Sequence, residues 1–464
     1  MTSTRVDAVD GLATRTLVTL RFFDDPAAPR IHLILYVPNA VAQPAPVFLG
    51  LNHLGNASLE SDPTLPLTDR WIRPAPEAGI VSNRATEATR GSHVSRWPLA
   101  MALRRGYAVA TFFYGDIEED HFDGWKNGLR GYLIRRDGRT GVKPDEWGAL
   151  GAWGWGLSRA LDYLETNPKV DARRVAVMGH SRHGKAALWA GAQDERFALV
   201  ISNNRGEGGA SLARRDFGET IAYSIEHAAF RYCENFRRFI GRAAELPFDQ
   251  HLLMALIAPR PLYVASATLD DLSDPRGEFL SAVHAAPVYR LFGYEGLGIT
   301  EYPAPDHPVG RRIGYHLRTG QHDTTAYDWE QYLAFADRHF KTTAARPGVP
   351  LAISGLTHRI ATPQKINKTS VRIPSASGSR IGDTPVAGLL SANSSQSHDA
   401  PPPTPLPSPQ IQFPRNQLIN KTSVRIPSAS APGSATLLSP DCFRLTHPNP
   451  TMPLPQPPFP PRKS

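Results

Sequence analysis

The sequence predicts an α/β fold, a three-layer sandwich in which a mostly parallel central sheet is covered by helices on both faces. Short runs rich in β-branched and aromatic residues, bounded by Pro, Asp and Gly, are typical of strands. In the second half of the chain these runs alternate with segments that carry apolar residues at helical spacing. The strand runs are almost continuously apolar, which indicates that both faces of the sheet are covered.

Four strands are expected in the first part of the chain. The first two lie close together and are predicted to form a hairpin. A long polar insertion separates the third strand from the fourth. The four expected strands are Thr14–Phe23, Ile31–Tyr36, Val47–Asn52 and Tyr107–Phe113.

Helices and strands then alternate as far as residue 340. The first helix shows Trp, Leu and Ala at helical spacing and ends before Pro168, which cannot continue a helix. The expected helices are Glu146–Asn167, Gly184–Ala192, Pro275–Phe292 and Asp328–Phe340, and the expected strands are Arg174–Gly179, Phe197–Ser202, Pro261–Ala267 and Ile313–Leu317.

Composition divides the chain into a folded domain at 1–345 and a Pro/Ser-rich basic tail at 346–464. From residue 342 onward there are 23 of the 43 Pro, no Trp and no Tyr, and 12 basic residues against 3 acidic ones. Such a segment cannot bury enough apolar surface to offset the entropy lost on ordering, so we expect disorder there.

A duplication lies inside this tail. The twelve residues Ile366–Ser377 recur unchanged at Ile419–Ser430. A solenoid would need three or more stacked units, so one duplication indicates a repeated linker. The alternative is a Pro-rich segment that docks into the groove of a Pro-recognition domain.

Charge and hydropathy exclude several classes of protein. The tail has a net charge of +9 and the whole chain one of +8, so the domain has a net charge of −1. The domain therefore has no excess of basic residues that would predict nucleic-acid binding. No apolar run is long enough to span a membrane.

As written, the N-terminus has charges where a signal peptide has its apolar region, which predicts a cytoplasmic location. A secreted or periplasmic location is expected instead if the true N-terminus is missing. The two cysteines, Cys233 and Cys442, do not form a disulfide framework.

The strongest chemical motif is the segment 178–185, which reads Met-Gly-His-Ser-Arg-His-Gly-Lys. In α/β-hydrolases the nucleophile lies on a sharp turn between a strand and a helix, flanked by small residues because the helix approaches the strand closely. Here a predicted strand precedes Ser181 and a small-residue helix follows it. The second glycine comes one position later than in Gly-x-Ser-x-Gly, and His183 stands in its usual place. The sequence therefore predicts Ser181 as the nucleophile of an α/β-hydrolase, against the alternative of a helix-capping serine.

This motif resembles the Gly-Cys/His-Ser-Arg-x-Gly-Lys signature of the bacterial-type glucuronoyl esterases of carbohydrate esterase family 15. These enzymes cleave esters of 4-O-methyl-glucuronic acid that link xylan to lignin alcohols. The resemblance covers the domain at 1–345 and none of the tail. Further shared segments are Gly50–Asn56, Ser95–Pro98, Tyr114–Ile117, Asn203–Gly209, Leu246–His251, Ala258–Ala267, Asp274–Phe279 and Gly320–Asp323.

The resemblance implies His322 as the general base that activates Ser181. His322 follows the last apolar strand and matches the family's catalytic histidine. The competing histidines are His307, in a Pro-rich loop, and His316, which lies inside a strand and is expected to be packed.

The acid of the triad is expected to be Asp270. In the resembling family the acid comes from the loop after the sixth or the seventh strand, and Asn204 occupies the first of these places. Asp270 matches the position on the seventh-strand loop. The alternatives are its neighbour Asp271 and Glu207, which lies in the earlier loop.

Arg182 is expected to supply the oxyanion site through its backbone N–H, and the resemblance implies a contribution from its guanidinium. Lys185 and Glu219 match positions that bind sugar hydroxyls in the family. Leu272 stands where the family usually has a Trp that stacks on the uronate. No cofactor or metal is expected, because no cluster of His, Cys and carboxylates has ligand spacing.

The expected activity is therefore hydrolysis of glucuronoyl esters through an acyl-enzyme, with an oligosaccharide or smaller uronate ester as substrate. A broader esterase that acts on acetyl or small alkyl esters is the alternative that Leu272 favours. A third hypothesis is a non-catalytic scaffold that presents the Pro-rich tail to a partner.

Overall fold

The computed structural model describes residues 2–41 and 44–341. The tail at 346–464, with its duplicated segment, its predicted disorder and its hypothetical docking role, lies outside the described residues. Within the described part, no helix is long and apolar enough to cross a membrane.

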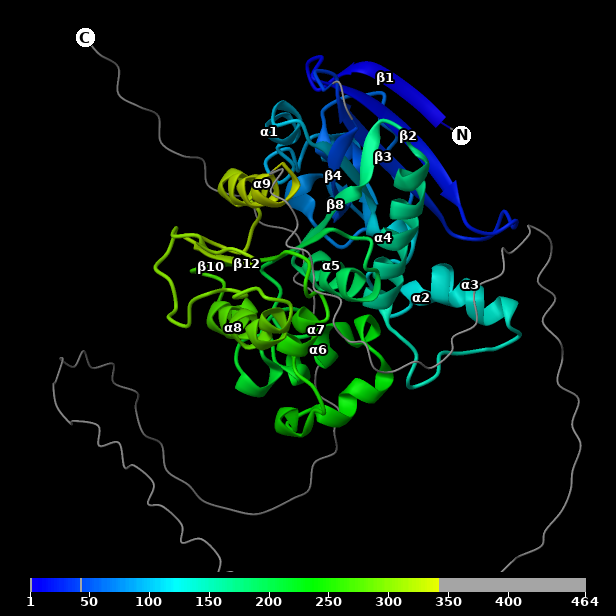
Figure 1. The fold of residues 1–464 in the computed structure, drawn as a ribbon. Helices are drawn as coiled ribbons and strands as arrows, with labels where there is room; N and C mark the ends of the chain where they lie inside the picture. Colours follow the sequence, from blue (N-terminus) through cyan, green and yellow to red (C-terminus); the bar gives the residue numbers. More distant parts are fainter. Residues whose placement is uncertain (1, 42–43, 342–464) are drawn as a thin grey trace, which may run out of the picture. The chain divides into compact units, whose positions relative to one another are not determined.

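The α/β fold predicted from the sequence is confirmed by a ten-stranded mixed sheet (Figure 1). The strands follow the order β1-β2-β3-β7-β4-β8-β9-β10-β12-β11, and the six from β7 to β12 are mutually parallel. Their bounds are β1 (Thr2–Ala8), β2 (Ala13–Arg21), β3 (Arg30–Pro38), β4 (Ala45–Asn52), β7 (Ala108–Phe113), β8 (Val170–His180), β9 (Leu199–Asn203), β10 (Leu262–Ala267), β12 (Ile313–Arg318) and β11 (Val309–Gly310). A separate small hairpin pairs β5 (Ile80–Val81) with β6 (Arg84–Ala85).

All eight strands expected from the sequence are present, and β2 and β3 form the predicted hairpin, in register from Ala13 opposite Pro38 to Arg21 opposite Arg30. The edge strand β1 was not predicted. Six of its seven residues are exposed, so it carries no apolar pattern, and it is held by antiparallel pairing with β2.

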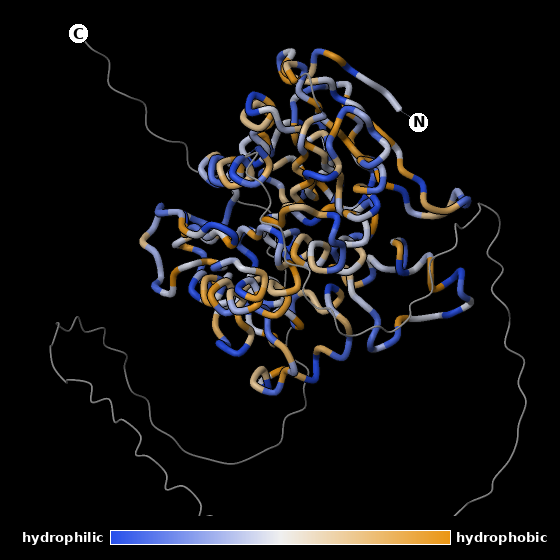
Figure 2. The backbone as a smooth tube through the Cα atoms, viewed as in Figure 1, coloured by the Kyte–Doolittle hydropathy of each residue, from blue (hydrophilic) through white to orange (hydrophobic). Residues whose placement is uncertain are grey.

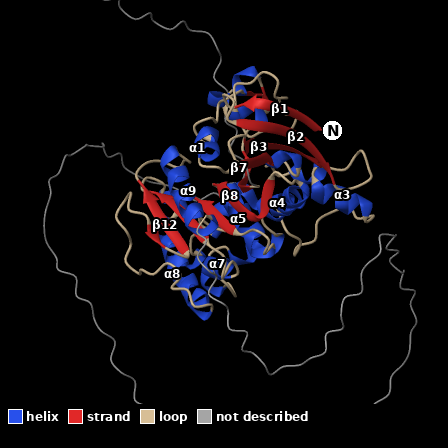
Figure 3. Ribbon diagram, turned by 45° about the horizontal axis from the view of Figure 1, so that its top comes forward, coloured by secondary structure: helices blue, strands red, loops and turns tan. Residues whose placement is uncertain are grey.

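Helices cover both faces of the sheet (Figure 3). One core packs α4, α5 and α8 against strand residues such as Val47 and Leu49, while a second core packs α1 and α9 against Phe48 and Tyr263. Alternate residues of β4 thus point into opposite cores, as the pleat of a strand requires. The apolar stretches of the central strands are visible in Figure 2. The helices are α1 (Leu99–Arg104), α2 (Gly124–Asn127), α3 (Leu129–Arg136), α4 (Ala149–Thr166), α5 (Arg182–Gln193), α6 (Ile221–Ala228), α7 (Gln250–Ala255), α8 (Pro275–Leu291) and α9 (Ala326–Phe340).

The parallel strands place their carboxyl ends at one edge of the sheet, where ligands bind in α/β proteins. Four of these ends lead directly into the segments expected to carry chemistry: β8 leads to Ser181, β9 to Asn204, β10 to Asp270 and β12 to His322. Because β8, β9, β10 and β12 are consecutive neighbours, these four side chains belong to adjoining loops.

Candidate active site

Ser181 lies on a strained turn between β8 and α5. Its backbone has φ 58° and ψ −135°, a conformation that non-glycine residues rarely adopt, and its N–H donates to the carbonyl of Asn203 at 2.9 Å. A Cβ on Gly179 would lie 2.1 Å from the carbonyl oxygen of His183, and one on Gly184 would lie 2.9 Å from that of Gly179. The two glycines thus face each other across the turn. This contact explains why the second glycine of the motif, Gly184, comes one position later than in Gly-x-Ser-x-Gly.

His183, which stands in the usual place of that glycine, is a packed residue. Its Nδ1 atom is 3.1 Å from the carbonyl oxygen of Leu51, and its ring packs at a tilt against that of His53 with centroids 3.9 Å apart. Burial lowers the pKa of His183 well below its ordinary value, and the nearby Arg182 lowers it further. These contacts indicate that His183 is a neutral ring that packs beside the turn.

His322 and Asp270 are hydrogen-bonded, with His322 Nδ1 2.7 Å from Asp270 Oδ2. Asp270 is 5 % exposed. Burial alone would raise the pKa of Asp270, but hydrogen bonds from His322, Ser273 and Asn204 outweigh it and hold the pKa below its ordinary value. An ionised carboxylate only accepts hydrogen bonds, so Nδ1 of His322 carries the proton and Nε2 is left as the basic nitrogen.

Asn204 and the two alternative acids occupy different positions. The side-chain amide of Asn204 donates to Asp270 Oδ2 at 2.8 Å. Asp271 is exposed and begins the 3-10 turn Asp271–Ser273. Glu207 is buried, accepts the N–H of Gly208 at 2.9 Å, and has its pKa raised to about 8 by burial. Of the three candidate acids Asp270, Asp271 and Glu207, the structure brings Asp270 to His322.

The two competing histidines are bonded to other partners. His316 is buried in β12, as expected, and its two ring nitrogens contact Tyr263 and Asp328, each at 2.9 Å. His307 is exposed in its loop, with Nδ1 2.7 Å from the carbonyl oxygen of Pro305.

Arg182 opens α5 directly after Ser181, and its guanidinium is fixed from two sides. Nε lies 3.1 Å from Asp120 Oδ2, and the guanidinium carbon lies 5.5 Å from the centre of the Tyr114 ring. Asp120 also receives two 2.7 Å hydrogen bonds from Arg231 and lies 3.6 Å from Arg73. Three arginines around one buried carboxylate leave positive charge beside the nucleophile.

Lys185 lies one helical turn beyond Ser181 and is buried. Its Nζ donates to Glu219 Oε2 at 2.7 Å and to the hydroxyl of Tyr232 at 3.1 Å. Burial alone would lower the pKa of Lys185, but the Glu219 carboxylate outweighs it and raises the pKa above its ordinary value. Lys185 therefore stays charged, and the structure joins it to Glu219 as one polar group. No three His, Cys, Asp or Glu side chains within 2–41 and 44–341 are grouped to hold a metal.

The chain is similar to known proteins over most of the described domain. A family model of fungal glucuronyl esterases matches residues 141–293. The carbohydrate esterase MZ0003, from an unknown prokaryotic organism, is 45% identical over 332 residues, which are 72% of this chain and 76% of that protein. The chain belongs to the glucuronoyl esterases of carbohydrate esterase family 15.

Solved structures of this family have the same fold. A glucuronoyl esterase from Solibacter usitatus matches with a TM-score of 0.68 and 47% identity over 73% of this chain and 84% of its own. A CE15 esterase from a marine bacterial metagenome, described as promiscuous, matches with a TM-score of 0.67 and 43% identity over 73% of this chain and 85% of its own. This chain is thus a carbohydrate esterase, and the expected class of enzyme is confirmed.

The sequence did not reveal how this esterase holds the loop that carries His322. Arg318, the last residue of β12, donates through Nη2 to the carbonyl oxygens of Gln321 at 2.7 Å and Asp323 at 3.1 Å. Its Nε lies 3.0 Å from Asp328 Oδ2. Arg318 therefore fixes the main chain on both sides of His322, but bonds to backbone oxygens leave no signal in a sequence.

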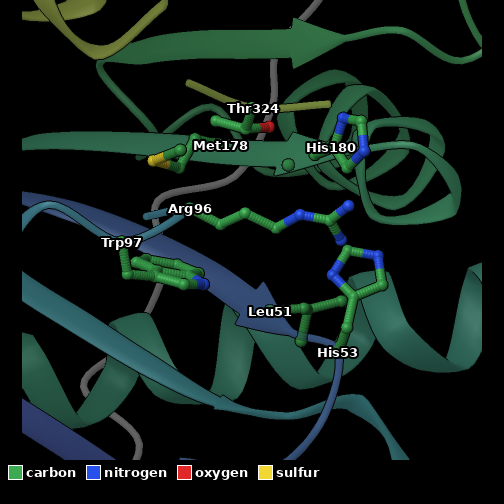
Figure 4. A pocket seen from close by; sticks show the side chains of 8 residues that line it. Leu51, His53, Arg96, Trp97, Met178, His180 and Thr324 are labelled. Atoms are coloured by element: carbon green, nitrogen blue, oxygen red, sulfur yellow. The ribbon is translucent and has the colours of Figure 1, made fainter. Parts of the chain in front are cut away.

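His180 is a second residue of the esterase whose place the sequence did not show. Its ring is buried, its Nδ1 atom is 2.7 Å from Asn203 Oδ1, and its centroid lies 4.6 Å from that of His322. Burial lowers the pKa of His180 well below its ordinary value. Figure 4 shows His180 and His53 lining a small pocket into which the Arg96 side chain extends.

Proposed function

We propose that this esterase hydrolyses glucuronoyl esters, of the 4-O-methyl-glucuronate type, through an acyl-enzyme on Ser181. The hydrogen bond between His322 and Asp270, in the loops that adjoin the strained turn of Ser181, is the observation that carries the proposal. Asp270 fixes the ring of His322 so that Nε2 takes the proton of the Ser181 hydroxyl during attack on the ester carbonyl. His322 then gives this proton to the departing alcohol, and a water molecule releases the uronate by the reverse sequence.

The oxyanion that forms during attack is stabilised by Arg182. The N–H of Arg182 lies in the first turn of α5, where backbone donors have no partner within the helix. The guanidinium, which is held in an ion pair with Asp120, adds positive charge near the oxyanion. Removing one such donor costs roughly 3 kcal/mol of transition-state stabilisation in serine hydrolases.

The sugar ring of the substrate is proposed to bind at Lys185 and Glu219. The ammonium group of Lys185 supplies donors and the carboxylate of Glu219 supplies acceptors, and their 2.7 Å contact holds both in place for vicinal hydroxyls. The names of two relatives, a glucuronoyl esterase and a carbohydrate esterase, support a sugar ester as substrate.

A broader esterase is the second candidate, and Leu272 favours it. Leu272 is 46 % exposed, and its carbonyl oxygen accepts the N–H of Glu219 at 2.7 Å, so its side chain lies at the rim of the sugar site. An aliphatic side chain stacks less well on a pyranose than an indole does, which relaxes selection for the sugar.

Turnover of the methyl ester of glucuronate, compared with that of an aryl acetate, separates the two candidates. The glucuronoyl proposal predicts a kcat/KM for the uronate ester at least about tenfold higher, and it predicts that Lys185→Met lowers this value while leaving the acetate rate within a few fold. Equal values for both esters, unaffected by Lys185→Met, would support the broader esterase instead.

A further inference from the structure

Arg205, which follows Asn204 in the loop after β9, carries a fully buried guanidinium. Its side chain has no exposed surface, so it touches neither solvent nor a bound ester. Nη2 donates to the carbonyl oxygen of Ala265 at 3.0 Å, and the same oxygen accepts the N–H of Asn204 at 2.8 Å. Arg205 therefore fastens the β9 loop to β10, the strand that leads to Asp270.

Glu278 of α8 binds both the main chain and the side chain of Arg205. Its Oε1 accepts the N–H of Arg205 at 2.8 Å and lies 3.4 Å from Nη2. Its Oε2 accepts the hydroxyl of Ser266 on β10. The side chain of Glu278 is also fully buried. These bonds join α8, the β9 loop and β10 around one guanidinium.

The side chain of Arg205 also packs against α5, the helix that follows the nucleophile. A Cβ on Gly184 of this helix would lie 3.0 Å from Nε and 3.2 Å from Cδ of Arg205. The hydroxyl of Ser202, on β9, donates to the carbonyl oxygen of Gly184 at 2.9 Å. The guanidinium therefore lies between the helix that follows Ser181 and the strand that precedes Asp270.

Two donor atoms of this guanidinium, Nε and Nη1, have no hydrogen-bond partner within the part of the chain that the structure describes. Leaving a buried donor unpaired is costly, and a neutral side chain of similar length would fill the space without that cost. Packing alone therefore does not explain an arginine at this position. A role for its charge remains.

Asp270 is a second carboxylate that interacts with Arg205. Burial lowers the pKa of Arg205 below its ordinary value, while Glu278 and Asp270 act in the opposite direction. Burial raises the pKa of Glu278 to about 7, although Arg205 opposes this shift. Glu278 therefore gains a proton in the acidic range, and Asp270 remains as a carboxylate opposite the cation. A nearby cation in turn favours the ionised form of Asp270.

Three further titratable groups face Arg205, and burial keeps each of them neutral near neutral pH. Two are tyrosines whose pKa values burial raises well above the ordinary value, and one is a histidine whose pKa burial lowers well below it. They are Tyr332 of α9, Tyr315 of β12 and His180 of β8. His322 itself faces Asp270, the ring of His180, and the ion pair of its neighbour Asp323 with Arg96.

We propose that Arg205 is a positioning residue of the triad, which fixes the β9 and β10 loops around Asp270 and favours, by its charge, the carboxylate that orients His322. The inference rests on the proposed function, because it takes Ser181, His322 and Asp270 as the triad. Arg205 acts through Asp270 and does not touch the ester. Its removal should therefore change kcat and the pH profile but not KM.

The test compares two variants that differ only in the cation. Glu278→Gln mimics the protonated carboxyl and keeps Arg205, whereas the double variant Arg205→Met/Glu278→Gln removes the cation without leaving a buried carboxylate unpaired. Loss of the cation stabilises the protonated forms of Asp270 and His322. The acidic limb of kcat/KM in the double variant should therefore lie at least about half a pH unit above that of Glu278→Gln. At neutral pH its kcat should be about tenfold lower and its KM within about twofold, since only the positioning of the triad is impaired.

Arg205→Lys separates the charge from the geometry. Lysine keeps the cation, so the acidic limb should coincide with that of the wild type, but it lacks the planar fork that binds Ala265 and Glu278, so kcat should still fall several fold. Thermal melting shows first that each variant is folded. If the methionine variant does not fold, Arg205→Gln in the Glu278→Gln background gives the same comparison.

Three results would overturn the role of Arg205. Coincident acidic limbs in Glu278→Gln and the folded double variant would remove the effect of the charge. A limb that moves as far in Arg205→Lys as in the double variant would do the same. A KM that rises tenfold while kcat is unchanged would assign Arg205 to substrate binding. The profile can be measured on a uronate ester or on an aryl acetate, so these outcomes do not depend on the substrate class. An unchanged kcat in Asp270→Asn would show instead that the triad itself is wrong.

Discussion

The side-chain amide of Asn204 donates to Oδ2 of Asp270 at 2.8 Å, and the same oxygen lies 2.7 Å from Nδ1 of His322. Side chains from the loops after β9 and β12 therefore meet at one oxygen of Asp270, which lies in the loop after β10, and the β9 loop contributes a neutral group. The amide lowers the pKa of Asp270 without adding charge, so Asp270 is ionised at neutral pH.

Replacing this amide by a second carboxylate should move the pH profile. In Asn204→Asp, two carboxylates at hydrogen-bond distance cannot both ionise readily, so the pair retains a proton to higher pH. The added negative charge also stabilises protonated His322. Both effects shift the acidic limb of kcat/KM toward higher pH, by about one unit or more. A profile that coincides with that of the wild type would show that residue 204 does not face the acid.

Asp270→Asn should reduce kcat about 10³- to 10⁴-fold, because an amide no longer holds His322 in the tautomer with a basic Nε2. Asp271→Asn is the matched control, one residue away and exposed, and should stay within about threefold of the wild type. Steady-state kinetics on a benzyl glucuronate measure both. A large loss in the control and none in Asp270→Asn would move the acid to Asp271.

Arg318→Lys should lower kcat about tenfold with little change in KM. Lysine keeps the charge beside Asp328 but cannot donate to the carbonyl oxygens of Gln321 and Asp323 in the same geometry, so the loop of His322 loosens. Arg312→Lys, in which the replaced arginine bonds to Pro259 and lies away from this loop, is the control. If kcat and KM are both unchanged in Arg318→Lys, Arg318 does not position His322.

Glu207→Gln should remove part of the pH dependence of stability. The pKa of Glu207 is about 8 in the folded protein and about 4.5 in an ordinary glutamate. The folded protein therefore holds a proton that the unfolded chain releases, and its stability falls as pH rises from about 4.5 through about 8. Glutamine stays neutral, so the free energy of unfolding of the variant should exceed that of the wild type at pH 9 by up to about 5 kcal/mol, but not at pH 4. Denaturant unfolding at the two values checks this, and parallel pH dependences would contradict a buried, protonated Glu207.

The central sheet and the order of the site loops could be predicted because strands β4, β7, β10 and β12 are buried along their whole length and leave apolar runs in the sequence. The edge strand β1 has no such run. At the site, Ser181 was marked by its glycines, and His322 and Asp270 were marked by family resemblance and by their places after strands. Arg318 could not be found because it binds main-chain oxygens.

Hydrolysis of a glucuronate ester by Ser181→Ala tests the central claim most directly. The substitution removes only the hydroxyl. Ser3→Ala, on the exposed strand β1, is the control for activity lost during preparation of a variant. With Ser181 as the nucleophile, kcat should fall by at least about 10⁴-fold while the control keeps full activity, since a missing serine abolishes the acyl-enzyme. Hydrolysis by Ser181→Ala at the rate of the wild type would contradict the account.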